Sequence, residues 1–317
     1  MLNIFDMHWP IMALASVIWW LSPFGLKLPS PTGMTDLQHY ALHGPVQAMR
    51  GEEATFKYGV ESKRTLTGTA VFDTHGYVTD EVQYLQGKLH ITNTNNYDDK
   101  GRLAKQERTL QLRREGEEAG DTKLLTEATY TYDDQGRMSA MHSHLSLQGA
   151  STDENQAIDM GIANTFDGLG RVAEQTWKVD KSKDTSDFIL AHRFTYRPNG
   201  AEGTILNISN ATSPNKSAWT RYNAQGDVTE SRQFDEHGTV SNKAYLLFTP
   251  EGALQRTAGL INGKMVRQQY GDYVYDAHGN WTKRICYEIS EKDGKEVLTA
   301  AKVEYRMFSY YTEKGKE

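Results

Sequence analysis

The chain has 317 residues, 38% of them apolar, so it is long enough to bury a sizeable core. Its net charge of -6 and isoelectric point near 6.0 give no electrostatic support for a nucleic-acid partner. Cys286 is the only cysteine, which excludes a disulfide framework and argues against a cysteine-based metal site.

Residues 1–33 differ in composition from the rest of the chain. Residues 9–26 are almost wholly apolar and carry no charge, and a helix of that length rises roughly 27 Å, enough to cross a bilayer core. A secretory signal should begin with lysine or arginine, whereas Asp6 is the only charge before Lys27. Three interpretations stay open: an uncleaved membrane anchor, an atypical signal segment and a buried helix. Residues 29–33 contain two prolines and are interpreted as a linker.

Residues 34–317 are interpreted as one β domain. Thr35 followed by Gln38 predicts the start of one short helix. Gly44 and Pro45 would end it, and a strand is expected from Val46 toward Phe56 and Tyr58.

Nine later stretches share one pattern. In each, an aromatic residue is followed by glycine four positions later and, in eight of the nine, by an apolar residue six positions later. The aromatic residues are Phe72, Tyr97, Tyr132, Phe166, Tyr196, Tyr222, Phe234, Phe248 and Tyr275. The glycines are Gly76, Gly101, Gly136, Gly170, Gly200, Gly226, Gly238, Gly252 and Gly279. The residues six positions on are Val78, Leu103, Met138, Val172, Glu202, Val228, Val240, Leu254 and Trp281.

In six copies an aspartate follows the aromatic residue, which predicts a tight turn. Aspartate at the first position of a type I turn accepts a hydrogen bond from the backbone two residues on, and glycine at the fourth position takes the left-handed conformation at little cost. Each aromatic residue should therefore end one strand of a hairpin, and the residue six positions later should begin the next. The aspartates are Asp73, Asp98, Asp133, Asp167, Asp235 and Asp276.

Three copies lack the aspartate and have Arg197, Asn223 or Thr249 instead. Asparagine can make the same side-chain bond. The other two copies place proline next, at Pro198 and Pro250, and proline presets the backbone of the second turn position.

These turns predict an all-β fold, a repeat array of antiparallel hairpins in a long sheet that is twisted or curled into a partial shell. The repeats span residues 72–281, and a C-terminal hairpin over residues 282–311 should cap one end of the array. Second turns are expected at residues 85–88, 261–264 and 292–295. The polar inserts 113–123, 148–162, 180–187 and 207–217 should be exposed.

Four of these stretches, at residues 97–103, 132–138, 166–172 and 275–281, resemble the YD repeat of the Rhs (rearrangement hot spot) proteins. The resemblance covers about residues 72–281 and is closest to the small stand-alone YD-repeat proteins of bacteria. It implies a strand–turn–strand surface that is exported or displayed on the cell, often sugar-binding. The large Rhs toxins enclose a C-terminal toxic domain in such repeats, and we expect this chain to be too short for that plan.

No familiar catalytic or phosphate-binding motif occurs in the sequence. His142 and His144 would share one strand face, but two ligands are too few for a metal site. The turn aspartates could suggest a glycosidase, although their turn-capping role explains them all. We therefore expect no catalytic residue, no cofactor and no metal. Trp219 lies outside the repeat pattern, beside a polar insert, and is the best candidate for a ligand contact.

The favoured function is a non-enzymatic binding protein of the cell envelope, either periplasmic, anchored in the inner membrane through residues 9–26, or secreted. Its partner would be another protein, a toxin or effector in an immunity-type role by analogy with the family. The alternative is a cell-surface carbohydrate-binding protein, in which exposed tryptophan rings would contact a glycan. An enzyme is the least favoured interpretation.

Overall fold

The computed structural model describes residues 35–312 except 86, 113–121, 149–155, 181–187, 197–201, 208–214, 223–227, 236, 250–252 and 262–263. The chain divides into two units, residues 1–34 and 35–317, and every described residue belongs to the second. The predicted anchor or signal segment and its linker lie outside the described residues. Among the residues that are described, no helix has the length and apolar character needed to span a membrane.

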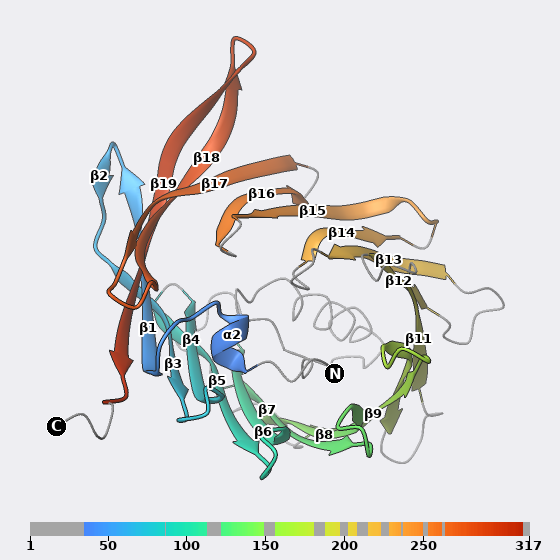
Figure 1. Ribbon diagram of the computed structural model, residues 1–317. Coiled ribbons are helices and arrows are strands. Elements are labelled where there is room, and N and C mark those ends of the chain that lie inside the picture. Colours follow the sequence, from blue (N-terminus) through green and yellow to red (C-terminus); the bar gives the residue numbers. More distant parts are fainter. Residues whose placement is uncertain are drawn as a thin grey trace. The chain divides into compact units, whose positions relative to one another are not determined.

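The described chain is almost entirely β-structure, which confirms the predicted fold class (Figure 1). The single helix of the described residues is α2 (Asp36–His39). The strands are β1 (Val46–Lys57), β2 (Val60–Glu61), β3 (Thr65–Phe72), β4 (Val78–Leu85), β5 (Lys88–Tyr97), β6 (Leu103–Leu112), β7 (Thr122–Tyr132), β8 (Met138–Gln148), β9 (Gln156–Phe166), β10 (Val172–Asp180), β11 (Phe188–Tyr196), β12 (Glu202–Asn207), β13 (Asn215–Tyr222), β14 (Val228–Phe234), β15 (Val240–Phe248), β16 (Leu254–Ile261), β17 (Lys264–Tyr275), β18 (Trp281–Lys292) and β19 (Lys295–Tyr310).

The repeat pattern sets the strand boundaries. Each of the nine aromatic residues is the last residue of a strand, and each residue six positions later is the first of the next. Beside the aromatic residue the register slips: Val71 pairs with Asp80, whereas Phe72 pairs with Val78. This extra residue is the bulge expected when a type I turn ends in a left-handed residue.

The helix begins at the predicted position. Thr35 caps it, because its hydroxyl accepts from the Gln38 backbone at 3.3 Å while the Gln38 side chain accepts from the Thr35 backbone at 2.8 Å. Tyr40, just after the helix, packs edge-on against Phe72 with ring centroids 6.1 Å apart. The helix therefore lies on the face of the sheet that carries Phe72, whose side chain is fully buried.

All strands belong to one antiparallel sheet, in which each strand from β3 to β19 pairs with its neighbour in sequence. Strand β1 pairs with β3 on one side and with β19 on the other. The C-terminal hairpin, predicted to cap one end of the array, is thus itself paired with β1. Strand β1 covers the hydrogen-bonding edges that β3 and β19 would otherwise present to solvent.

Side chains reinforce this junction. The Asn280 amide accepts from the His43 backbone at 2.7 Å and donates to the His43 carbonyl at 2.8 Å. Tyr311 donates its hydroxyl to the Phe72 carbonyl at 2.6 Å. The Asn280 bonds link the segment before β1 to the last repeat turn. The Tyr311 bond links the residue after β19 to the end of β3, where the first repeat turn begins.

Two details of the sequence interpretation were wrong. The predicted inserts are shorter than expected, because β7 begins at Thr122, β9 at Gln156 and β13 at Asn215. The sequence pattern also favours a core position for the aromatic residues of the repeats. Phe72 is fully buried, whereas the Tyr275 side chain is 52% exposed and stacks on Tyr273.

Candidate functional site

The predicted turn aspartates hold the turns. In each of the six turns, one carboxylate oxygen accepts from the backbone N–H groups two and four residues later, at 2.8–3.0 Å. The fourth-position glycines have positive φ between 71° and 88°, and they are Gly76, Gly101, Gly136, Gly170, Gly238 and Gly279. Gly200, Gly226 and Gly252 lie outside the described residues. Thr249 substitutes for aspartate and accepts from the Ala253 backbone at 3.2 Å.

Three turns carry an arginine that the sequence analysis did not single out. Arg102, Arg137 and Arg171 each donate Nε to the second carboxylate oxygen of the turn aspartate, at 2.7–2.8 Å. The Arg102 guanidinium also lies 4.5 Å from the ring centre of Tyr132, the aromatic residue of the following turn. Arg137 lies 4.1 Å from Phe166 in the same way. Arg102 and Arg137 therefore couple consecutive turns.

Trp219, the predicted ligand contact, lies half-buried in β13 among charged side chains. The Arg232 and Arg221 guanidiniums are 4.8 Å and 5.1 Å from its ring centre. Both arginines pair with Glu230, Arg232 at 2.6 Å and Arg221 at 3.4 Å, and the Glu230 side chain is only 6% exposed. The indole therefore sits in a cluster of two cations held by one carboxylate.

The cluster continues across the neighbouring strands. Paired residues of antiparallel strands share a face of the sheet, and Glu230 pairs with Tyr245 and Arg232 with Lys243. Tyr245 then pairs with Ala258, and Ala258 with Arg267. We define the basic face as Trp219, Arg221, Glu230, Arg232, Lys243, Tyr245, Leu247, Arg256 and Arg267 together with Glu296.

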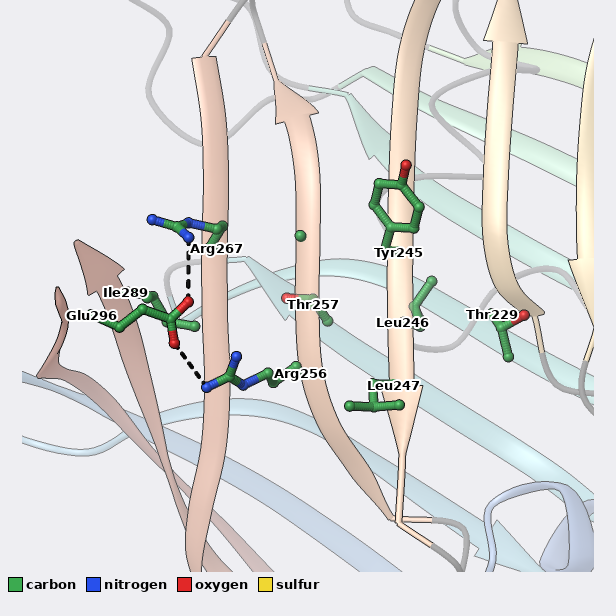
Figure 2. Close-up of a pocket in the computed structure, with 10 residues that line it drawn as sticks. Thr229, Tyr245, Leu246, Leu247, Arg256, Thr257, Arg267, Ile289 and Glu296 are labelled. Carbon is green, nitrogen blue, oxygen red and sulfur yellow. Dashed lines mark hydrogen bonds and ion pairs between the residues drawn. The ribbon is translucent and has the colours of Figure 1, made fainter. Parts of the chain in front are cut away.

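One part of the basic face is hollowed, with a volume of about 290 Å³. Figure 2 shows Arg256 and Arg267 on adjacent strands, both directed at Glu296 from β19. Glu296 accepts from Arg256 at 3.1 Å and from Arg267 at 3.3 Å. Tyr245 and Leu247 form the exposed apolar side of the hollow, with 36% and 52% of their surfaces exposed.

The charge of this face is opposite to that of the whole chain. It holds five cations and two carboxylates, a net charge of about +3, whereas the chain has a net charge of -6. Exposed Tyr245 and Leu247 lie among these cations. Such a surface is suited to an acidic partner.

The other residues considered from the sequence do not form a site. His142 and His144 are both exposed on one face of β8, and the His144 Nδ1 lies 2.9 Å from an Asp159 oxygen. Within the described part of the chain no three histidine, cysteine or acidic side chains group as metal ligands. Cys286 is fully buried in β18, and this burial raises the pKa of its thiol. It is therefore a structural residue rather than a reactive one.

Comparison with known proteins gives distant similarity only. No protein-family model matches the sequence, and no curated protein matches it. A porin-like protein from Bacteroides uniformis superposes with a TM-score of 0.34 and 10% identity over 84% of this chain and 99% of that one. A TcdB2–TccC3 structure gives a TM-score of 0.27 and 13% identity over 77% of this chain and 14% of that one. At these TM-scores neither similarity carries an argument about function.

Proposed function

We propose that this chain is a non-enzymatic binding protein whose basic face engages an acidic surface of a protein partner. The observation that carries the proposal is the cationic and aromatic face on β13–β17 of an otherwise acidic chain. Tryptophan, tyrosine and arginine are the residues that most often dominate the energy of protein interfaces. The face presents these side chains around an open hollow lined by Tyr245, Arg256 and Arg267.

The surroundings of Trp219 favour a protein partner over a neutral glycan. Sugars stack on open aromatic faces, and here two guanidiniums occupy the surroundings of the indole within 5.1 Å. A glycan would have to displace arginines that are paired with the nearly buried Glu230. An acidic side chain of a protein partner could instead pair with these arginines without displacing them.

The envelope location and the type of partner rest on the YD-repeat resemblance. By that analogy the partner is a toxin or effector and the role is of the immunity type. The basic face adds a physical requirement, because the partner must present carboxylates to it. Association should then be fast at low salt and slow at high salt.

A photo-crosslinking residue at Tyr245 tests the proposal in the cells that produce the full chain, with the exposed Thr131 of β7 as the control position. The expected result is a protein crosslinked at Tyr245 and not at Thr131. With that protein purified, Lys243→Glu should weaken binding by about tenfold or more. Lys88→Glu, a matched change on β5, should leave it unaltered.

Three results would overturn the proposal. They are equal crosslinking at Tyr245 and Thr131, an affinity for the partner that Lys243→Glu does not change, and hydrolase turnover by the purified chain. A crosslink to glycan or nucleic acid in place of protein would count in the same direction.

A further inference from the structure

A second cation cluster lies on the opposite face of the sheet and is independent of the proposed function. Gln269 pairs with Arg256 of the basic face, so the next residue, Tyr270, points the other way. Tyr270 pairs with Cys286, and Cys286 with Lys302. We define the Arg306 cluster as Tyr270, Trp281, Arg284, Lys302, Glu304 and Arg306.

The cluster has three cations, and the carboxylates of Glu304 and Glu53 form ion pairs with two of them, Arg284 and Lys302. Glu304 accepts from Arg284 Nε at 2.5 Å, and its other oxygen lies 2.7 Å from Lys302 Nζ. A Glu53 oxygen lies 3.4 Å from the same Lys302 nitrogen. Arg284 and Lys302 are therefore neutralised, and the cluster carries one cation in excess.

That cation is Arg306. Its guanidinium lies 3.8 Å from the ring centre of Trp281, and among the described residues it makes no hydrogen bond or ion pair. Burial, followed by repulsion from Arg284, lowers the pKa of Arg306 to about 9. A largely buried guanidinium without an ion pair of its own is unfavourable. The charge of Glu304 and the contact with the indole offset only part of that cost.

The geometry specifies what would complete the cluster. A guanidinium that stacks on a ring keeps its N–H groups in its own plane, where they match the two oxygens of a carboxylate. Arg284, which is paired with Glu304, lies 4.4 Å from the same Trp281 ring, so two guanidiniums contact one indole. The Arg306, Arg284 and Trp281 side chains are each partly accessible to solvent.

We propose that the Arg306 cluster binds the carboxylate of a small organic acid, with Arg306 as its bidentate partner and Trp281 as the platform that orients the guanidinium. A free acid and an acidic peptide side chain share this chemistry. The cluster would recognise the carboxylate in either setting.

Calorimetric titration of the full chain tests the site with glutarate as the probe, glutaramide as its neutral analogue and a short glutamate-containing peptide as the second source. Glutarate should bind and glutaramide should not, and preference for the peptide would identify that source. Arg306→Met should abolish glutarate binding. Arg306→Lys should weaken it by about tenfold or more, because lysine lacks the paired N–H groups that bind both carboxylate oxygens. Arg50→Met, at an exposed arginine of β1 that pairs with Glu52, should bind as the unaltered chain does.

Thermal unfolding without ligand separates a binding role from a structural one. If Arg306 binds an anion and has no structural role, Arg306→Met should leave the melting temperature unchanged or raise it. The substitution removes a largely buried cation that has no ion pair in the absence of ligand. Arg284→Met should lower the melting temperature, because Glu304 loses its partner. A lower melting temperature for Arg306→Met would overturn the proposal. So would the absence of glutarate binding at millimolar concentration, or binding that survives Arg306→Met.

Discussion

Glycines at the fourth position of the repeat turns share a left-handed backbone but differ in their surroundings. Gly136 has φ of 76°, and a methyl group added to it would meet nothing within 4 Å. Gly101 has φ of 71°, and the same methyl group would lie 2.7 Å from the Tyr77 ring. Tyr77 stacks on Tyr97, with ring centroids 4.9 Å apart, so its ring has little freedom to move.

Alanine at these two glycines should therefore destabilise the fold unequally. Gly136→Ala should cost about 1–2 kcal/mol, the usual penalty of a left-handed alanine. Gly101→Ala should cost about 1–2 kcal/mol more, because overpacking against Tyr77 is added. Urea unfolding of both variants measures the difference. Equal losses would mean that the Tyr77–Tyr97 stack does not confine the turn.

The turn carboxylates make stability depend on pH in a definite direction. The side-chain hydrogen bond from Arg137 lowers the pKa of Asp133, and the backbone N–H of Arg171 lowers the pKa of Asp167. A carboxyl whose pKa is lowered by folding stabilises the folded state above its unfolded pKa, which is about 3.9. That contribution is lost as the pH falls through the folded pKa.

The melting temperature should consequently fall below about pH 4. The double variant Asp133→Asn/Asp167→Asn should be less stable at neutral pH and should show a shallower fall with acid. Scanning calorimetry from neutral to acidic pH checks both points. An unchanged acid profile in the variant would show that these two turns do not contribute to the pH dependence.

Among the elements, the far half of the β18–β19 hairpin depends most on side chains. Strand β1 pairs with β19 from Lys302 to Tyr310, whereas residues 295–300 pair with β18. A two-stranded ribbon alone is marginally stable in water. The ion pairs of Glu296 with Arg256 and Arg267 link this ribbon to β16 and β17.

Glu296→Ala should loosen the ribbon locally. Amide hydrogen exchange should accelerate over residues 289–298, while global stability changes by no more than about 0.5 kcal/mol, because the ion pairs are exposed. Glu288→Ala, at an exposed position of β18 that opposes Thr299, is the matched control. Protection that persists in Glu296→Ala would show that strand pairing alone holds the ribbon.

The sequence predicts the local structure well because the information is local. Each repeat aromatic residue and its glycine are four positions apart, so the turn chemistry alone sets the end of β7 at Tyr132 and the start of β8 at Met138. The basic face could not be predicted, because it depends on which residues pair between strands. A bulge of one residue exchanges the two faces, and such bulges occur beside most repeat turns.

At the scale of the whole described domain, the position of β1 also could not be predicted from local sequence. Its partners in β19 lie more than two hundred residues away in sequence, and no local pattern specifies them. Ala48 pairs with Val71 of β3, and Arg50 pairs with Met307 of β19. This double pairing joins β3, the first strand of the repeat array, to β19, the last one.

Disulfide trapping tests this arrangement most directly. Cysteines at Ala48 and Val71, and in a second variant at Arg50 and Met307, replace directly opposed residues, while the native Cys286 is fully buried. Both variants should form the crosslink rapidly under mild oxidation, and cysteines at Arg50 and Val71, two residues out of register, should not. Failure of either opposed pair to crosslink, or equal crosslinking of the offset pair, would contradict the sheet described here.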